Sequence, residues 1–170
     1  MQTEAFFDTG TSTFSYLVLD PASKRCAIID SVLDYDPKSG RTRTTQADRL
    51  IARVRDLGAT VDWIIETHAH ADHLSAAAYL KAKLGGRTGI GEHITEVQKI
   101  FGSIFNAGAT FATDGRQFDQ LFADGDTFST GKLTFTVMHT PGHTPACLSY
   151  LVSDGQETIA FVGDTLFMPD

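Results

Sequence analysis

Hydrophobic and polar positions alternate with two different periods along the chain, and each change of period marks a predicted element. Residues 13–20 alternate with period two, and a second apolar run covers 25–30 after a turn at Pro21. Two such runs joined by a short turn predict a β-hairpin. Over 46–57 the apolar residues recur every three or four positions and end at Gly58, which predicts an amphipathic helix.

The rest of the chain alternates strand and helix and then becomes rich in strands. This order predicts an α+β fold, with a mixed sheet and helices packed outside it, rather than a doubly wound sheet. No segment is long enough to act as a linker, so we expect one domain over 1–170. The further predicted elements are strands at 61–65, 87–91, 133–138, 147–152 and 158–162, helices at 74–84 and 92–105, and loops at 34–44 and 106–115.

Composition narrows the class of protein. A hydrophobic content of 42% and a charged content of 21% are ordinary for a globular domain. The net charge of −7 argues against nucleic acid or an anionic membrane surface as a partner. No apolar run is long enough for a membrane span, and the N-terminus has neither signal-peptide nor transit-peptide character. We therefore expect a cytoplasmic protein.

The two cysteines, Cys26 and Cys147, are far apart and each lies in an apolar run. No CxxC pair is present. This usage is typical of buried, reduced thiols in a reducing compartment, and it argues against a disulfide or a redox pair.

The densest chemistry follows the predicted strand 61–65. His68, His70, Asp72 and His73 fall within six residues, and imidazole and carboxylate groups are ligands of first-row transition metals. Alternate side chains of an extended segment point the same way, so His68 and His70 are expected to face one ion. Asp72 and His73 are expected at or just before the first turn of the next helix.

Two more ligand-type residues stand at strand ends. His143 follows the Pro141-Gly142 turn, and Asp164 follows the strand 158–162. Packing neighbouring strands would bring these side chains to the cluster around His68. The sequence therefore predicts a metal centre built from three strand ends.

Taken one at a time, several of these residues have simpler interpretations. Asp164 alone could be a turn-forming aspartate, and Asp72 alone could cap a helix. His93 and His139 stand apart from the cluster, and we interpret them as helix-surface or turn residues. The cluster of His68, His70, Asp72 and His73 as a whole points to metal, and the two later strand ends strengthen that interpretation.

These strings resemble the metallo-β-lactamase superfamily, whose signature is HxHxDH followed by a single His and then an Asp. The likeness is strongest to the persulfide dioxygenase and glyoxalase II branch, including the bacterial members called β-lactamase hydrolase-like proteins. It implies a four-layer αββα sandwich and runs over essentially the whole chain. The strings that carry it are 27–32, 67–73, 91–94, 140–147 and 162–167.

Members of this family continue past the string at 162–167 and supply a final metal-binding histidine. No histidine follows His143 in this sequence. We therefore expect that the chain, which stops at Asp170, lacks the C-terminal part of the fold and the last ligand.

Resemblance to glyoxalase II implies a binuclear site, such as two zinc ions, at which a metal-bound hydroxide attacks a thioester. One metal would have three histidine ligands, and the other a carboxylate, a histidine and the missing histidine, with a second carboxylate bridging. The first set is His68, His70 and His143, the second includes Asp72 and His73, and the bridge is Asp164.

Resemblance to persulfide dioxygenases implies one Fe(II) held by His68, His143 and Asp164, a set with open positions for O2. A persulfide, with glutathione as the carrier implied by the family, would be oxidised to sulfite and the free thiol. His70, Asp72 and His73 would orient the ligands and bound water, with Asp72 as the expected catalytic group. The strings around the ligands favour this dioxygenase interpretation over the hydrolase.

The expected partners are a small thiol persulfide and O2. A different class of function is a non-catalytic domain that binds one metal ion weakly or serves for dimerisation. Sheet edges exposed by a missing half would favour pairing with a second copy, which makes a homodimer a candidate assembly.

Overall fold

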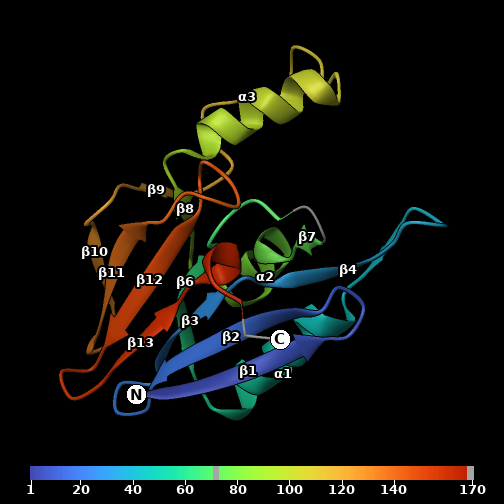
Figure 1. The fold of residues 1–170 in the computed structure, drawn as a ribbon. Helices are drawn as coiled ribbons and strands as arrows, with labels where there is room; N and C mark the ends of the chain where they lie inside the picture. The colour runs from blue at the N-terminus through green and yellow to red at the C-terminus, as the bar shows by residue number, and fades with distance from the viewer. Residues whose placement is uncertain (71–72, 168–170) are drawn as a thin grey trace. The chain divides into compact units, whose positions relative to one another are not determined.

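The computed structural model describes residues 1–70 and 73–167 (Figure 1). The chain divides into two compact units. Each unit is assembled from segments that are far apart in the sequence. That the chain forms a single domain stays a prediction. Unit 1 comprises Met1–Ile65, His70–Thr88 and Ser129–Leu133, and unit 2 comprises Glu66–Ala69, Gly89–Phe128 and Thr134–Asp170.

The main sheet of unit 1 contains the predicted hairpin. Its first three strands are antiparallel, and the fourth runs parallel to the third. The first strand was not predicted; it pairs along its whole length, from Gln2 opposite Leu19 to Asp8 opposite Thr13. In spatial order the strands are β1 (Gln2–Asp8), β2 (Thr13–Asp20), β3 (Arg25–Ile29) and β6 (Thr60–Ile65).

Two helices cover the core of unit 1. Helix α1 (Thr45–Asp56) confirms the predicted amphipathic helix, and it buries Leu50 and Val54. Helix α2 (Ala77–Leu84) buries Leu80. With them pack the inward residues of the sheet, which are among the most deeply buried in the chain: Leu17, Leu19, Cys26, Ile28, Val61 and Ile64.

A smaller sheet in unit 1 corrects two predictions. The predicted loop at 34–44 is instead a hairpin of β4 (Val32–Asp36) and β5 (Arg41–Arg43), in which all of β5 is exposed. The predicted helix start at Leu74 is also wrong. Leu74 and Ser75 form β7, which pairs with the start of β4, so the helix begins only at Ala77.

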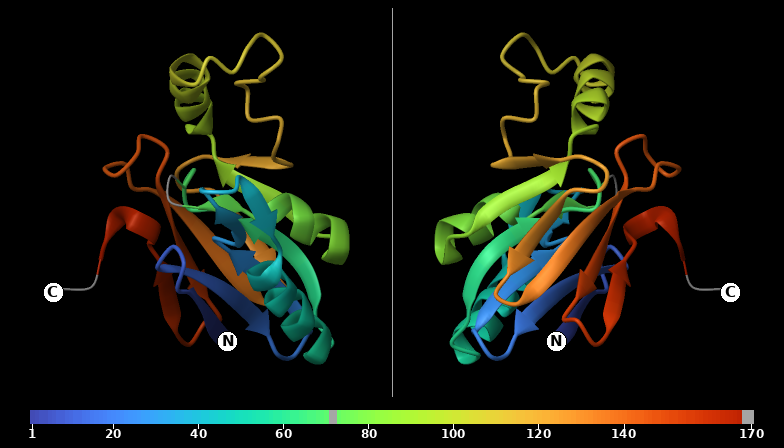
Figure 2. Two further views of the ribbon diagram at one scale, coloured as in Figure 1. Left: turned by 90° about the vertical axis from the view of Figure 1, so that its right-hand side faces the viewer. Right: turned by 90° about the vertical axis from the view of Figure 1, so that its left-hand side faces the viewer.

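Most of a second antiparallel sheet belongs to unit 2, and its neighbouring strands are joined by hydrogen bonds (Figure 2). The predicted strands at 133–138, 147–152 and 158–162 are confirmed, whereas β9 and β10 were not predicted. The sheet runs in the order β10 (Thr127–Thr130), β11 (Leu133–His139), β12 (Leu148–Ser153) and β13 (Thr158–Phe161). Outside this sheet, β8 (Arg87–Gly91) pairs in parallel with β9 (Gln120–Phe122).

Helix α3 (Ile94–Ile104) carries an apolar stripe that is covered only over its first half. Ile94 and Val97 are buried against Ile90 and Ala146. The stripe continues to Ile104, which is 66% exposed, and to the following Phe105. Among the described residues, no helix is both long and apolar enough to cross a membrane.

Candidate metal centre

Three ligand-type side chains converge in unit 2: His68, His143 and Asp164. Oδ2 of Asp164 lies 3.5 Å from Nε2 of His143 and 3.8 Å from Nε2 of His68. The two imidazole rings are nearly perpendicular, with centroids 5.1 Å apart. The three groups are at positions 68, 143 and 164, so only folding of the chain brings them together.

The donor set fits one metal ion. Bonds of about 2.1 Å place neighbouring ligand atoms roughly 3–3.5 Å apart, so the two separations from Asp164 require only a small closure. Two imidazoles and one carboxylate suit Fe(II) or Zn(II). Exposure rises from 1% for the His68 side chain to 35% for Asp164 and 41% for His143. One side of the set is therefore buried, and the other is open to a small molecule.

Main-chain bonds hold His68 in place beyond the end of β6. Glu66 donates its N–H to the carbonyl of Gly89 at 3.0 Å, and its own carbonyl accepts from the Tyr150 hydroxyl at 2.9 Å. Leu148 donates its N–H to the carbonyl of Thr67 at 2.8 Å. Glu66 and Thr67 are thus hydrogen-bonded to both β8 and β12, which fixes the backbone position from which the His68 side chain extends.

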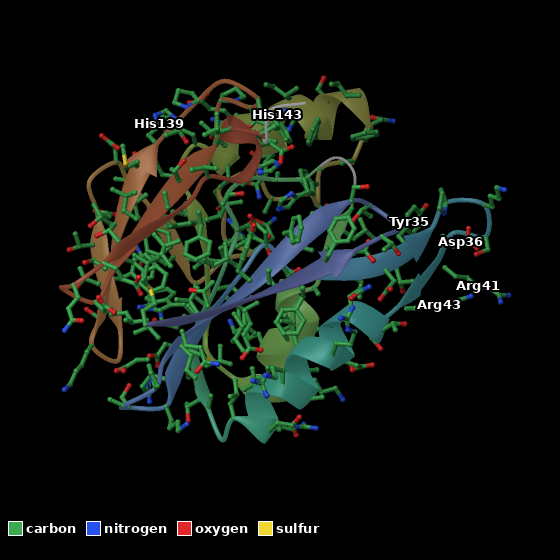
Figure 3. The ribbon with its side chains drawn as sticks, turned by 60° about the horizontal axis from the view of Figure 1, so that its bottom comes forward. Tyr35, Asp36, Arg41, Arg43, His139 and His143 are labelled. Atoms are coloured by element: carbon green, nitrogen blue, oxygen red, sulfur yellow. The ribbon has the colours of Figure 1, made fainter. Side chains whose placement is uncertain are left out.

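His143 sits on the loop between β11 and β12 and is exposed (Figure 3). The loop is closed by the N–H of Thr140, which donates to the carbonyl of Cys147 at 2.9 Å. The Cys147 sulfur also accepts from the N–H of Thr144 at 3.2 Å and lies 3.1 Å from its hydroxyl. Both cysteines are free and buried, as predicted, and Cys147 helps to shape the loop.

Asp164 lies in a short 3-10 turn, η1 (Gly163–Thr165), after β13. The Thr165 hydroxyl lies 3.0 Å from that of Thr140, which in turn lies 3.0 Å from the hydroxyl of Ser149. Thr165 can also donate to the Thr140 carbonyl at 3.4 Å. One direction of donation, from Ser149 to Thr140 to Thr165, satisfies all of these contacts. The chain of hydroxyls ties the Asp164 turn to the loop that carries His143.

His70 and His73 belong to unit 1. Nε2 of His70 lies 3.3 Å from Oδ1 of Asp30, and the rings of the two histidines are 4.0 Å apart. Nδ1 of His73 lies 3.4 Å from the Thr13 hydroxyl. Burial, followed by the charge of Asp30, raises the pKa of Tyr16. Sequence reasoning assigned Asp30 no role, although it directly follows the buried strand β3.

The alternation argument that joined His68 and His70 does not apply, and whether the two face one ion stays a prediction. Strand β6 ends at Ile65, so the period of two does not extend to His68 and His70, and the two side chains fall into different ligand-type groups. The position predicted for His73 is wrong, because β7 intervenes and the helix begins at Ala77. Asp72 lies outside the described residues, so its proposed roles as ligand, cap or catalytic group stay predictions.

His93 and His139 have partners away from the metal-type set. Their rings stack with centroids 4.4 Å apart and an interplanar angle of 14°. Nδ1 of His93 lies 2.9 Å from Glu96, and Nε2 of His139 lies 2.9 Å from the carbonyl of Pro145. His93 precedes the first turn of α3, which agrees with its interpretation as a helix-surface or turn residue, whereas His139 is the last residue of strand β11 and not a turn residue.

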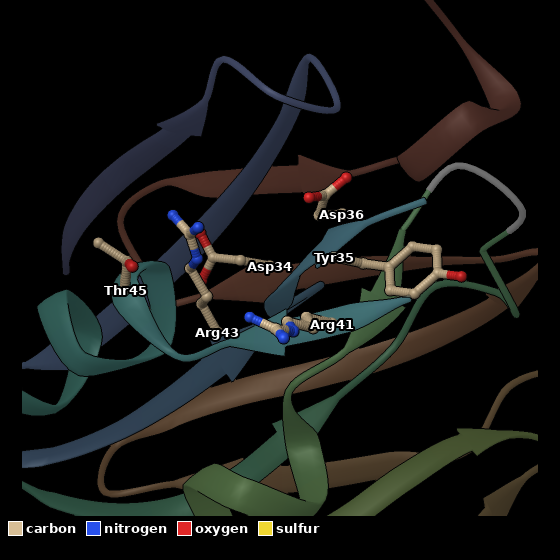
Figure 4. Close-up of a pocket in the computed structure, with 6 residues that line it drawn as sticks. All are labelled: Asp34, Tyr35, Asp36, Arg41, Arg43 and Thr45. Atoms are coloured by element: carbon tan, nitrogen blue, oxygen red, sulfur yellow. The ribbon is translucent and has the colours of Figure 1, made fainter. Parts of the chain in front are cut away.

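A pocket of about 290 Å³ lies on the β4–β5 hairpin of unit 1 (Figure 4). Asp34 stands opposite Arg43 in the strand register, and Asp36 stands opposite Arg41. Opposite charges therefore face each other within the hairpin, which leaves no net charge to select a ligand. The lining residues are Asp34, Tyr35, Asp36, Arg41, Arg43 and Thr45.

The fold and the histidine–carboxylate set resemble those of metal-dependent enzymes. The family model of the metallo-beta-lactamase superfamily matches residues 8–170, and the chain belongs to this superfamily, as its sequence strings predicted. The superfamily contains metal-dependent hydrolases and oxidoreductases. The predicted metallo-β-lactamase fold class is thereby confirmed.

Three individual relatives show which members of the superfamily the chain is similar to. A probable metallo-hydrolase of Burkholderia pseudomallei is 61% identical over 100% of this chain and 60% of its own length. A beta-lactamase hydrolase-like protein of Xylella fastidiosa is 53% identical over 97% of this chain and 37% of its own length. The crystal structure of ETHE1 from Myxococcus xanthus superposes with a TM-score of 0.72 and 29% identity, over 99% of this chain and 59% of that one. The chain thus spans less than two thirds of each of these relatives.

Proposed function

We propose that this chain forms the iron-binding part of a persulfide dioxygenase, with one Fe(II) held by His68, His143 and Asp164. The observation that carries the proposal is the convergence of two imidazoles and one carboxylate on a set with one open side. Such a set leaves coordination positions for O2 and a sulfur ligand. The 29% identity with an ETHE1 structure supports the same choice, since another relative of that name is a persulfide dioxygenase.

The residues of the set have distinct tasks. His68 is buried and bonded, so it fixes the position of the ion. Asp164 supplies a negative charge that partly balances the divalent cation. His143 lies at the open side, where a persulfide can approach. Iron bound there would supply the activation of O2, and the overall reaction converts a persulfide, O2 and water into a thiol, hydrogen sulfite and a proton.

A second candidate is a binuclear thioester hydrolase of the glyoxalase II kind. The name of the Burkholderia pseudomallei relative, a probable metallo-hydrolase at 61% identity, favours it. His73 is a further ligand-type group that the second metal would need, and its ring lies 4.0 Å from that of His70, which this scheme assigns to the first metal. A non-catalytic, metal-binding or dimerising role is the third outcome that the experiment must recognise.

The test combines metal analysis with two substrates. Protein purified without air is analysed for iron and zinc, and O2 uptake is followed with glutathione persulfide. About one iron per chain with O2 uptake supports the dioxygenase. Two zinc ions and hydrolysis of an acyl-glutathione thioester, without O2 uptake, support the hydrolase. Metal without either activity leaves the binding role, and His143→Ala serves as the control for site-bound metal.

A further inference from the structure

We propose that Thr67 is a positioning residue that sets the orientation of His68 and fixes the turn that carries Asp164. The inference rests on the proposed metal site but not on the reaction that the site performs. Thr67 and His68 are each only 1% exposed. The residue therefore acts from the buried side of the ligand set, out of reach of substrate.

The first contact is with the His68 ring. The Thr67 hydroxyl oxygen lies 3.0 Å from Nδ1 of His68, while Nε2 of the same ring faces Asp164. A nitrogen that binds a metal must present its lone pair, so the proton of the neutral ring belongs on Nδ1. Nδ1–H then donates to the Thr67 hydroxyl, which selects the tautomer that metal binding needs.

The second contact is with the Asp164 turn. A Cβ placed on Gly163 would lie 2.8 Å from Cβ of Thr67 and 3.3 Å from its Cγ2. Real side chains do not approach so closely, so only glycine allows this backbone to rest against Thr67. Gly163 also has a φ of +48°, a conformation that glycine adopts without penalty. The turn that carries Asp164 therefore packs directly against the side chain of Thr67, which fixes its position.

Thr67 itself is held by the main chain. Its carbonyl accepts the N–H of Leu148 at 2.8 Å, at the first residue of β12. One residue thus joins a fixed strand, the ring of one ligand and the turn of another. The hydroxyl alone lies against the His68 ring, whereas the hydroxyl and the methyl group both border the space that a Cβ on Gly163 would need, so removing each group in turn distinguishes the two contacts.

Two substitutions separate these contacts. Thr67→Val keeps the shape of the side chain and removes the hydroxyl, whereas Thr67→Ser keeps the hydroxyl and removes the methyl group. Thr130→Val is the matched control. Thr130 is a fully buried threonine of unit 1, and its hydroxyl has no hydrogen-bond partner among the described residues.

The first measurement is of the metal-free protein. Nitrogen-15 spectra of the histidine rings should show Nδ1 of His68 protonated in wild type and in Thr67→Ser. In Thr67→Val the ring should change to a mixture of tautomers or to the other tautomer. A wild-type ring that is protonated on Nε2, or an unchanged spectrum in Thr67→Val, would overturn the proposed hydrogen bond.

The second measurement is Zn(II) affinity, by competition with a chromophoric chelator. Loss of a group that orients a ligand weakens metal binding by about tenfold to a hundredfold, and we expect this range for Thr67→Val. Thr67→Ser should lose less, and Thr130→Val should bind as wild type does. Equal losses in Thr67→Val and Thr130→Val would reduce the effect to general loosening of the core and overturn the proposal.

The two proposals fail in different ways. If wild type binds Zn(II) but oxidises no persulfide, the proposed dioxygenase fails and the role of Thr67 stands on affinity and tautomer. If Thr67→Val does not fold, the positioning role of Thr67 is still tested by the tautomer of wild-type His68 and by the Zn(II) affinity of Thr67→Ser. A proton on Nε2 of the wild-type ring would contradict that role directly. A thermal unfolding scan of each metal-free variant identifies that case.

Discussion

Nε2 of His70 lies 3.3 Å from Oδ1 of Asp30, and both side chains are almost completely buried, at 6% and 7% exposure. Asp30 reaches this position with a φ of +51°, which is uncommon for a residue other than glycine. Its backbone N–H is held by the carbonyl of Ile65 at 3.0 Å. The carboxylate is therefore a fixed partner for His70. In the binuclear scheme His70 is a metal ligand and in the mononuclear scheme it is not, so replacing His70 distinguishes the two.

Replacement of His70 should leave metal retention intact if one ion is held by the set in unit 2. We expect about one metal per chain in His70→Ala. His68→Ala, His143→Ala and Asp164→Ala should each abolish retention, because two ligands remain. Elemental analysis after desalting measures this. Loss of all metal in His70→Ala would favour the three-histidine site of the hydrolase scheme, and wild-type metal content in any of the other three variants would remove that residue from the set.

Gly163→Ala should weaken both stability and metal binding. The new Cβ would meet Thr67, and alanine disfavours a φ of +48°. Gly155→Ala is the matched control, since Gly155 also has a positive φ but nothing lies within 4 Å of its Cβ position. Backbone strain alone costs about 1 kcal/mol. Chemical unfolding should therefore show a larger loss in Gly163→Ala, and only this variant should lose Zn(II) affinity; equal behaviour of the two would contradict the close approach.

The two cysteines should differ in their tolerance of serine. Cys26 is fully buried in the apolar core of unit 1, and burial raises its thiol pKa to about 12. It should not react with a thiol-specific disulfide reagent near neutral pH until the protein unfolds. Cys26→Ser should lose about 1–3 kcal/mol of unfolding free energy because its hydroxyl is buried among apolar groups.

Cys147→Ser should be better tolerated, because the serine oxygen can accept from the same Thr144 groups as the sulfur does. Turnover, once an activity is established, should be nearly unchanged in both serine variants. An inactive Cys147→Ser that still folds would show that the thiol does more than shape the loop.

Asp20 should make stability depend on acid pH. Hydrogen bonds from the Ser23 hydroxyl and the N–H of Lys132 lower the pKa of its carboxyl to about 2. Because the folded state binds this proton less tightly than the unfolded chain, the stabilisation is complete above the ordinary value of 3.8 and is lost as pH falls towards about 2.

Asp20→Asn should therefore lower the unfolding free energy by about 1–2 kcal/mol at neutral pH, with a difference from wild type that shrinks between pH 4 and 2. Urea unfolding at a series of pH values measures it. Asp36→Asn is a control on an exposed turn that accepts similar local bonds. A difference that stays constant with pH would rule out the carboxylate as the cause.

The elements that the sequence predicted correctly are those with a strong period or clear turns. Helix α1 has its apolar residues on one face, and β2 and β3 are joined by a tight turn. Strand β1 was missed because it is only partly buried and depends on its partner β2. The charged hairpin at β4 and β5 reads as a loop, and the pairing of Leu74 with Leu33 is a long-range contact that no local pattern records.

For the site, residue chemistry was predictable and its arrangement was not. Spacing singled out His68, His143 and Asp164 as ligand types, but nothing in the spacing states which histidines share a group. The partner of His70 is Asp30, 40 positions earlier in the chain. The seating of Gly163 against Thr67 likewise depends on packing between segments almost a hundred residues apart, which a single sequence does not encode in any local motif.

Helix α3 has a consequence for how the protein behaves as a solute. Its first half is anchored in unit 2, whereas Ile104 and Phe105 present their side chains to water at 66% and 73% exposure. Apolar hydration becomes less favourable when strongly excluded salts such as sulfate are added, and it is most tolerable in the cold. The C-terminal end of α3 should therefore be one of the apolar surfaces that limit solubility, and chilled, low-sulfate buffers should favour the dispersed chain.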